Sequence, residues 1–271
     1  MSERIKKIFE KKEKKLLTFT TGGDPDLDTS FEILKIIIKN KIDLIEIGMP
    51  FSDPMADGPI IQESSRRSIA SGTKINDIFE IVNQIRQFNN EIPIVLMGYY
   101  NSIFNLGIDN FTSKCAETGV DGLIIVDLQP EEDSELYLKS KEKNIDLIRL
   151  ITPTTDEKRL STILSNSSGF LYYVTITGIT GQNSADIEYL KKSINIVKSS
   201  TTLPIIAGFG IKNRKDVEQI SAFTDGVVVG SSIVNIIKKN LDDKNKMINE
   251  IDFFTKDLKE GVKRWIGLQT S

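Results

Sequence analysis

The stretch at residues 42–48, IDLIEIG, is a short and nearly continuous apolar run. Such a run is typical of a parallel β-strand that is covered on both faces, whereas an antiparallel strand at the surface alternates apolar with polar residues. Comparable runs recur at residues 16–21, 93–99, 122–128, 145–151, 169–175, 204–210 and 226–231. The sequence therefore predicts eight parallel strands.

Helical patterns separate these apolar runs. Apolar residues recur with helical spacing in TSFEILKIIIKN (29–40), KINDIFEIVNQIRQF (74–88) and ADIEYLKKSINIVKSS (185–200). Eight alternating strand–helix units favour a closed barrel over an open doubly wound sheet. An open sheet of that kind usually has fewer strands and a phosphate loop after its first strand. We therefore predict an α/β fold, a single (β/α)8 TIM barrel that spans residues 1–271 as one domain, with an extra N-terminal helix and additional helices such as the one at 245–265.

Composition and charge narrow the class of ligand. The 35 basic and 38 acidic side chains give a formal net charge of -3, so no basic excess points to nucleic acid. Cys115 is the only cysteine and histidine is absent, which excludes an intramolecular disulfide and a Cys/His zinc site. The charged stretch MSERIKKIFEKKEKK lacks the apolar core of a secretory signal, and no apolar run is long enough to span a membrane. We expect a cytoplasmic protein that acts on a small molecule, without a nucleic-acid or membrane partner.

Glu46 is the first candidate catalytic residue. Period-two alternation in IDLIEIG places Leu44 and Glu46 on one face of the strand and Ile45 and Ile47 on the other, where they suit packing against helices. Glu46 is then expected to point into the mouth of the barrel. An acid on an apolar inward face needs a raised pKa or a paired cation, and a raised pKa suits a group that transfers protons near neutral pH. The alternative is a buried glutamate tied to an interior cation.

Two aspartates follow in the loop GMPFSDPMADGP (48–59). Asp53 and Asp57 lie among prolines and glycines that exclude regular structure, so each is compatible with an ordinary turn role. A long loop at the C-terminal end of a barrel strand is, however, where this fold carries its chemistry. The position of both aspartates beside Glu46 therefore favours a functional role.

Glycine-rich segments follow the last three strands: TGITG (177–181), GFG (208–210) and GSS (230–232). Barrel phosphate sites are commonly built from such loops together with a helix N-terminus. We therefore predict a phosphate cradle there. No apolar run ends in lysine, so a Schiff-base aldolase has no obvious nucleophile. The acids do not make a convincing metal site, although a magnesium site built from oxygen ligands stays open.

Seven motifs, taken in order along nearly the whole chain, resemble the tryptophan synthase alpha subunit family. They are FTTGGDP (19–25), EIGMPFSDPMADGP (46–59), MGYYNSIFNLGIDNF (97–111), DLQPEE (127–132), TGITG, GFGI and VVVGSSIV (227–234). The resemblance implies a TIM barrel that splits indole-3-glycerol phosphate into indole and glyceraldehyde 3-phosphate by a retro-aldol step. It also implies a beta subunit that carries pyridoxal phosphate and consumes the indole in an alpha2-beta2 tetramer, with no cofactor and no metal in this chain.

The resemblance assigns roles to individual residues. Glu46 falls at the general acid/base of the family and Asp57 at the acid that pairs with the indole N–H. The apolar pocket positions are Phe19, Met97, Tyr99, Leu150 and Tyr172. The lid and phosphate positions are Thr180, Gly181, Gly208, Phe209, Gly210, Gly230 and Ser231. The expected partner interface contains Asp53, Pro54, Asn101 and Phe104.

Two positions depart from what we expect, and two rival functions stay open. Gln129 stands where proline is expected in a partner-facing loop, and Arg149 faces the helices if Leu150 faces the pocket. A buried arginine there needs a buried acid or a route to solvent. The rivals are another phosphosugar barrel enzyme, such as an isomerase or epimerase, and a barrel that has lost activity and serves as an activator of a partner enzyme.

Overall fold

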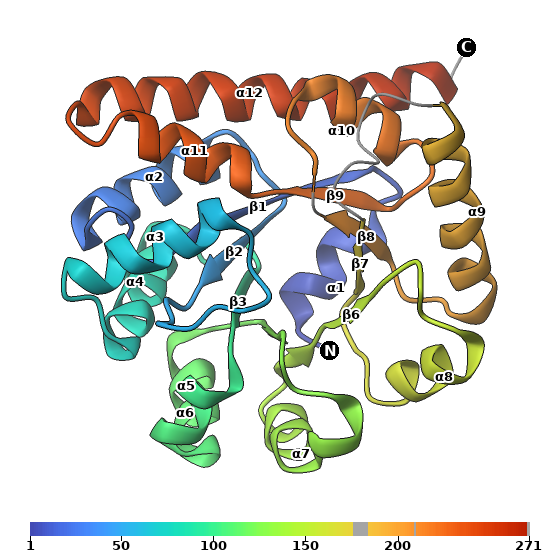
Figure 1. Ribbon diagram of the computed structural model, residues 1–271, viewed down its shortest axis with the longest axis horizontal. Coiled ribbons are helices and arrows are strands. Elements are labelled where there is room, and N and C mark those ends of the chain that lie inside the picture. The colour runs from blue at the N-terminus through green and yellow to red at the C-terminus, as the bar shows by residue number, and fades with distance from the viewer. Residues whose placement is uncertain (176–183, 209, 270–271) are drawn as a thin grey trace.

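The strands form one parallel sheet that closes into a barrel (Figure 1). The computed structural model describes residues 1–175, 184–208 and 210–269. In this part of the chain the strand order is β5-β4-β3-β2-β1-β9-β8-β7-β6. The strands are β1 (Lys15–Thr21), β2 (Leu44–Gly48), β3 (Ile94–Gly98), β4 (Gly122–Ile125), β5 (Asp146–Leu147), β6 (Arg149–Ile151), β7 (Leu171–Val174), β8 (Ile205–Gly208) and β9 (Gly226–Val229).

The two ends of this sheet are one extended segment. Only Ile148 separates β5, which pairs with β4, from β6, which pairs with β7. The Ile148 amide still donates a 3.0 Å hydrogen bond to the carbonyl of Leu123 in β4. The predicted strand at 145–151 is therefore present but divided in two, and the (β/α)8 TIM barrel is confirmed.

Helices surround the barrel at the predicted places. The stretches at 29–40, 74–88 and 185–200 form α2 (Leu27–Lys39), α4 (Ile75–Phe88) and α9 (Ser184–Ser200). The remaining helices are α1 (Glu3–Glu10), α3 (Pro59–Ala70), α5 (Tyr100–Leu106), α6 (Ile108–Thr118), the short 3-10 turn η1 (Pro130–Glu132), α7 (Ser134–Glu142), α8 (Glu157–Ser165), α10 (Arg214–Ser221), α11 (Ser231–Lys239) and α12 (Lys244–Gln269). No helix in the described ranges combines the length and apolarity needed to cross a membrane.

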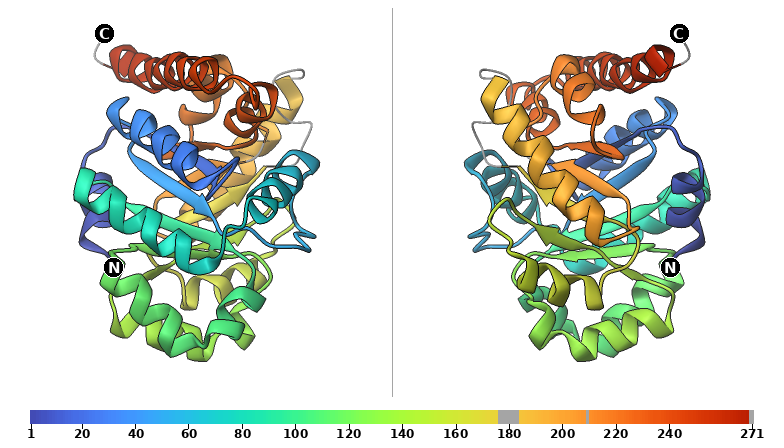
Figure 2. Two further views of the ribbon diagram at one scale, coloured as in Figure 1. Left: turned by 90° about the vertical axis from the view of Figure 1, so that its left-hand side faces the viewer. Right: turned by 90° about the vertical axis from the view of Figure 1, so that its right-hand side faces the viewer.

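The two extra helices occupy different places. Helix α12 runs along the outside of the barrel against α2, α10 and α11. Helix α1 closes one end of the barrel, while α3 lies toward the other end (Figure 2). Ile5 of α1 is fully buried in the same cluster as Leu17 and Leu44, and Phe9 packs on Phe170 with ring centroids 5.8 Å apart. The end next to α1 is therefore plugged, which leaves the C-terminal ends of the strands for a site.

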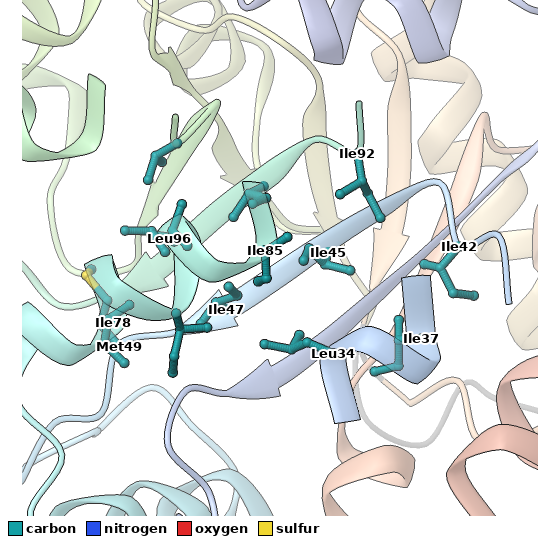
Figure 3. Close-up of a cluster of buried hydrophobic side chains, with 14 of the residues drawn as sticks. Leu34, Ile37, Ile42, Ile45, Ile47, Met49, Ile78, Ile85, Ile92 and Leu96 are labelled. Atoms are coloured by element: carbon teal, nitrogen blue, oxygen red, sulfur yellow. The ribbon is translucent and has the colours of Figure 1, made fainter. Parts of the chain in front are cut away.

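The sheet has an apolar layer on each of its faces. Outside, Ile45 and Ile47 of β2 belong to the cluster that includes Leu34 and Ile37 of α2 and Ile78 of α4 (Figure 3). Inside, Leu17, Leu44, Val95, Ile124, Ile206 and Val228 fill the barrel. Full burial of one such side chain contributes about 1.5–3 kcal/mol relative to its exposure. The predicted alternation along β2 is confirmed, and it leaves a carboxyl group among the inner apolar side chains.

Candidate active site

Glu46 lies in the middle of β2, next to Phe19 of β1 and Val95 of β3 in the strand register. The residue is fully buried, and neither of its carboxyl oxygens has a hydrogen-bond partner among the described residues. Burial without a compensating partner disfavours the charged form, and it raises the pKa of Glu46 to about 8. The alternative of a glutamate tied to an interior cation finds no such cation in the described part of the chain. Glu46 is therefore a neutral acid at neutral pH.

Asp57 is held by the loop between β2 and α3. The Asp57 amide donates to the Pro54 carbonyl at 3.1 Å, and the side chain of Gln62 donates to the Asp57 carbonyl at 3.0 Å. Helix α3 begins directly afterwards at Pro59, whose missing N–H suits the first helical position. The turn role and the functional role weighed for Asp57 are thus compatible, since its backbone makes the turn and leaves the side chain available.

Tyr99, at the end of β3, sets the direction of the Asp57 carboxylate. Its hydroxyl donates to Asp57 Oδ2 at 3.0 Å and accepts from the Ala56 amide at 3.0 Å. The ring of Phe51 stacks on the Tyr99 ring with centroids 5.1 Å apart. Burial raises the pKa of Asp57, and the hydrogen bond from Tyr99 opposes that rise because it favours the ionised carboxylate.

A cavity at the C-terminal ends of the strands brings many of the predicted residues together. Its lining contains Phe19, Asp57, Met97, Tyr172, Gly210, Gly230 and Ser231. It also contains Ile61, Ile211 and Val228, which sequence reasoning missed, although the inward position of Val228 in β9 follows the same alternation that identified Glu46. An adjoining cavity shares Phe19, Asp57 and Met97 and adds Tyr99 and Val126.

Three predicted catalytic or substrate-binding residues within the described ranges do not line these cavities: Leu150, Glu46 and Gly208. Leu150 packs with the inner cluster beside Tyr172, its neighbour in the register of β6 and β7. Glu46 has no exposed surface, and its neighbour in the strand register, Phe19, lines both cavities. Tyr172 is itself buried, and its pKa is raised by burial and by the nearby carboxyl groups of Glu46 and Asp57.

The predicted phosphate end is only partly described. Gly230 precedes the first residue of α11, Ser231, so the unpaired N–H groups of the first helical turn lie beside the cavity. Gly210 has φ +75°, in the left-handed region that favours glycine. Gly208 leaves room for the side chain of Tyr172, because an added Cβ at residue 208 would lie 2.2 Å from the tyrosine hydroxyl oxygen. Thr180, Gly181 and Phe209 lie outside the described residues.

The expected partner residues differ in exposure. Asp53 and Asn101 are exposed, and Phe104 on α5 keeps 67% of its surface, whereas Pro54 is buried within its own loop. Met55 was not predicted, yet 82% of its surface is exposed. The sequence signal for an exposed apolar side chain here is a methionine that stands among small and polar residues in a loop.

The need of Arg149 for a buried acid is met. The guanidinium forms an ion pair with Asp133, which has no exposed side-chain surface, and it donates to the Leu128 carbonyl at 3.4 Å. Gln129, the other departure, accepts from Arg159 of α8 at 3.4 Å, and Arg159 also pairs with Glu131.

Comparison with known proteins gives a consistent result. Residues 5–263 match the family model described as tryptophan synthase alpha chain. A tryptophan synthase alpha chain from Petrotoga mobilis is 45% identical over 256 residues, which cover 94% of this chain and 98% of that one. The crystal structure of tryptophan synthase subunit alpha from Legionella pneumophila has a TM-score of 0.90 at 32% identity and covers 97% of this chain and 99% of that chain. An open form of tryptophan synthase from M. tuberculosis has a TM-score of 0.85 at 27% identity, covering 96% and 98%.

Proposed function

This chain belongs to the tryptophan synthase alpha chain family, and we propose that its Glu46 and Asp57 carry the family's cleavage of indole-3-glycerol phosphate to indole and glyceraldehyde 3-phosphate. The chain is accordingly a carbon–carbon lyase of tryptophan biosynthesis. The observation that supports the assignment most is the buried, unpaired carboxyl of Glu46, because an expensive acid in an apolar barrel interior indicates a functional role.

Glu46 is assigned both proton transfers. Cleavage requires a proton on C3 of the indole ring and removal of the proton from the glycerol hydroxyl next to the breaking bond. With a pKa of about 8 Glu46 starts protonated, so it gives its proton to C3. The resulting carboxylate then takes the hydroxyl proton, the C–O bond becomes the aldehyde, and the electrons of the broken C–C bond restore the indole ring. Glu46 ends as it began, ready for the next cycle.

Asp57 is assigned the charge that develops on the ring. Protonation at C3 makes the indole ring positive, and a carboxylate that accepts the ring N–H stabilises that charge. The Tyr99 hydroxyl supports this role because it holds the carboxylate in one direction before substrate arrives. Phe19, Met97 and Tyr172 supply apolar surface for a flat indole, and Leu150 packs in the inner cluster next to Tyr172.

The phosphate of the substrate is assigned to the other end of the cavity. Ser231 and Gly230 lie at the N-terminus of α11, where backbone N–H groups and the helix dipole favour an anion. Gly210 lines the same cavity from the loop after β8. This arrangement orients the substrate with its indole toward Asp57.

The partner is a tryptophan synthase beta subunit, and we propose that it contacts the exposed residues Asp53, Asn101 and Phe104. Pro54, which follows Asp53, is buried. We propose an alpha2-beta2 tetramer in which the beta subunit holds pyridoxal phosphate. The steps assigned to this chain are proton transfers and charge stabilisation, which its side chains supply, so we propose that it binds no cofactor of its own. The free, buried thiol of Cys115 supports a location in the reducing cytoplasm.

The deciding experiment measures indole release from indole-3-glycerol phosphate, with and without a cognate beta chain. Glu46→Gln keeps size and polarity but cannot transfer protons, so kcat should fall by roughly 10²–10⁴ while substrate still binds. Glu80→Gln, an exposed change on α4, is the matched control. A phosphosugar isomerase would release no indole, and an inactive activator would stimulate the beta chain without releasing indole. If Glu46→Gln kept most of the wild-type kcat, Glu46 would have no place in the mechanism.

A further inference from the structure

The side chain of Arg149, in β6, contacts a loop that has no assigned role in the reaction. The loop of residues 128–133 follows β4, and the guanidinium contacts both of its ends: the Leu128 carbonyl and the Asp133 carboxylate. Arg149 and Asp133 are both buried. Burial lowers the pKa of Arg149 to about 10, so the side chain stays charged at neutral pH and the pair is a true ion pair. Arg149 therefore ties both ends of this loop to β6, while Arg159 of α8 binds the middle of the loop through Gln129 and Glu131.

The residues just before the loop reach the candidate active site. The Val126 amide donates to the Gly98 carbonyl at 3.0 Å, and Val126 lines the cavity next to Asp57 and Tyr99. The Asp127 carboxylate accepts from the Tyr100 amide at 2.8 Å, at the first turn of α5. Tyr100 directly follows Tyr99, whose hydroxyl holds Asp57. Hydrogen bonds and chain neighbours thus connect Arg149 to Asp57, through Leu128 and Asp127 on one side and Tyr100 and Tyr99 on the other.

We propose that Arg149 is a positioning residue for the cleavage: by bridging Leu128 and Asp133 it keeps Asp127 on the first turn of α5, and so sets the Tyr99 hydroxyl against Asp57. The proposal rests on the assignment of Asp57 in the proposed function. A flexible or shifted loop would let Asp127 leave the Tyr100 amide, and the Tyr99 side chain would then sample directions that do not orient the carboxylate. Catalysis is sensitive to such small displacements, since a misplacement of about 1 Å costs on the order of 10²-fold in rate.

Arg86 provides a matched control, because it binds the chain just before β4, whereas Arg149 binds the loop after β4. It pairs with buried Asp121, directly before β4, at 2.6 Å, and it donates to the carbonyls of Gly119 and Ile92. Like Arg149 it is an arginine that pairs with a buried carboxylate and also binds the main chain, and only 10% of its side chain is exposed. It lies at the plugged end of the barrel, so its loss should affect stability without affecting the direction of Tyr99.

The experiment compares Arg149→Met, Arg149→Lys and Arg86→Met in the full chain, below the unfolding temperature of each. For Arg149→Met we expect kcat to fall about 10- to 100-fold with little change in KM, because Phe19, Met97 and the phosphate end of the cavity do not depend on the direction of the Tyr99 hydroxyl. Arg149→Lys keeps the charge but not the fork geometry, and it should restore part of the loss. Arg86→Met should keep wild-type kcat. Equal losses of kcat in Arg86→Met and Arg149→Met would overturn the proposal.

A double variant separates positioning from stability. Replacing a buried pair by apolar residues is often neutral or stabilising, so Arg149→Met with Asp133→Leu should fold well even if Arg149→Met alone does not. We expect this double variant to regain thermal stability and to keep the low kcat. A double variant with wild-type kcat would show that the pair serves the fold alone, and the proposal would be wrong.

Amide hydrogen exchange reads the positioning without any assay of activity. In the Arg149 variants the Tyr100 amide should exchange faster, because its acceptor Asp127 is no longer held, while the Ile94 amide, bonded to Asp121 at 2.9 Å, should not change. Unchanged protection of Tyr100 would refute the proposal. If the wild-type chain released no indole, the proposed function would fail, and this exchange experiment would still decide whether Arg149 sets the first turn of α5.

Discussion

The hydroxyl of Tyr99 donates a 3.0 Å hydrogen bond to the carboxylate of Asp57, which joins the loop after β2 to the end of β3. The same oxygen accepts the Ala56 amide, so the bond also anchors the backbone beside Asp57. The carboxylate is therefore aimed before any ligand binds. An electrostatic role in catalysis depends on such preorganisation, because charges fixed in advance need no rearrangement during the reaction.

Tyr99→Phe should weaken catalysis without removing either acid. A hydrogen bond to a charged group contributes about 1.5–3 kcal/mol, which corresponds to a loss in kcat/KM of roughly 10- to 150-fold. The bond also opposes the rise in the pKa of Asp57, so its loss should raise that pKa further and make the defect largest at acidic pH. Steady-state kinetics across pH test this, with Tyr137→Phe on α7 as the control. A defect of the same size at every pH would argue against the effect on ionisation.

The pH profile of the wild-type chain should be bell-shaped. Glu46 must start protonated, and its pKa of about 8 predicts that kcat/KM falls as the pH rises through that value. Asp57 must be ionised, so kcat/KM should also fall at acidic pH, at a pKa above the ordinary value for aspartate. The substrate phosphate titrates near pH 6, and the pH dependence of inhibition by glycerol phosphate isolates that contribution. Constant kcat/KM from about pH 7 to about pH 9.5 would contradict the assignment of Glu46.

Glu46→Gln should stabilise the fold, increasingly so at higher pH. Folded Glu46 holds its proton up to a pKa of about 8, while in the unfolded chain it ionises at its ordinary value. Between these values the unfolded state binds fewer protons, so the wild-type free energy of unfolding decreases as pH rises, by about 1.4 kcal/mol per unit. The amide that replaces the carboxyl group in the variant does not titrate. Denaturant unfolding at about pH 5 and about pH 8 should show the advantage of the variant growing by about 3–4 kcal/mol, whereas Glu80→Gln should show no such trend.

Ser231→Asp should separate phosphate binding from helix stability. A carboxylate at the first turn of α11 interacts favourably with the helix dipole, so the thermal stability should be kept. The same charge would repel a phosphate in the adjoining cavity, and both KM and the inhibition constant for glycerol phosphate should increase. Ser134→Asp, the same change at the first residue of α7, is the control. Unaltered constants in Ser231→Asp would mean that the phosphate binds elsewhere.

Phe104→Ser should reduce the affinity for the beta subunit and leave indole release by the isolated chain unchanged. Phe104 keeps 67% of its surface exposed, and it is not one of the catalytic residues assigned above. Its removal should therefore affect the surface buried in a complex rather than the fold. Phe253→Ser on α12, where 75% of the side chain is exposed, is the matched control. Calorimetric titration with a cognate beta chain measures the affinity of each variant, and an assay of indole release measures the activity of each isolated chain. Equal binding by the two variants would place the interface away from α5.

The local pattern of apolar and polar residues was sufficient to predict the strands of this protein and the direction of their side chains. Period-two alternation and burial on both faces are properties of a strand itself, so Ile45 and Ile47 are assigned to the helix side and Glu46 to the interior without a structure. The same pattern located the strands, and the glycines after β8 and β9 indicated the end of the barrel at which loops gather. The burial of Glu46 and the direction of its pKa follow from that single alternation.

Contacts between loops were decided only when the barrel closed. Tyr99 and Asp57 are 42 residues apart and meet because β2 and β3 are neighbours in the sheet. Arg149 pairs with Asp133 because the segment that contains β6 lies next to β4 and the loop that follows it. The burial of Pro54 and the exposure of Met55 likewise depend on how one loop folds over the strand ends. Such pairings have no local periodicity in the sequence, since they arise from the ring that eight strand–helix units form only together.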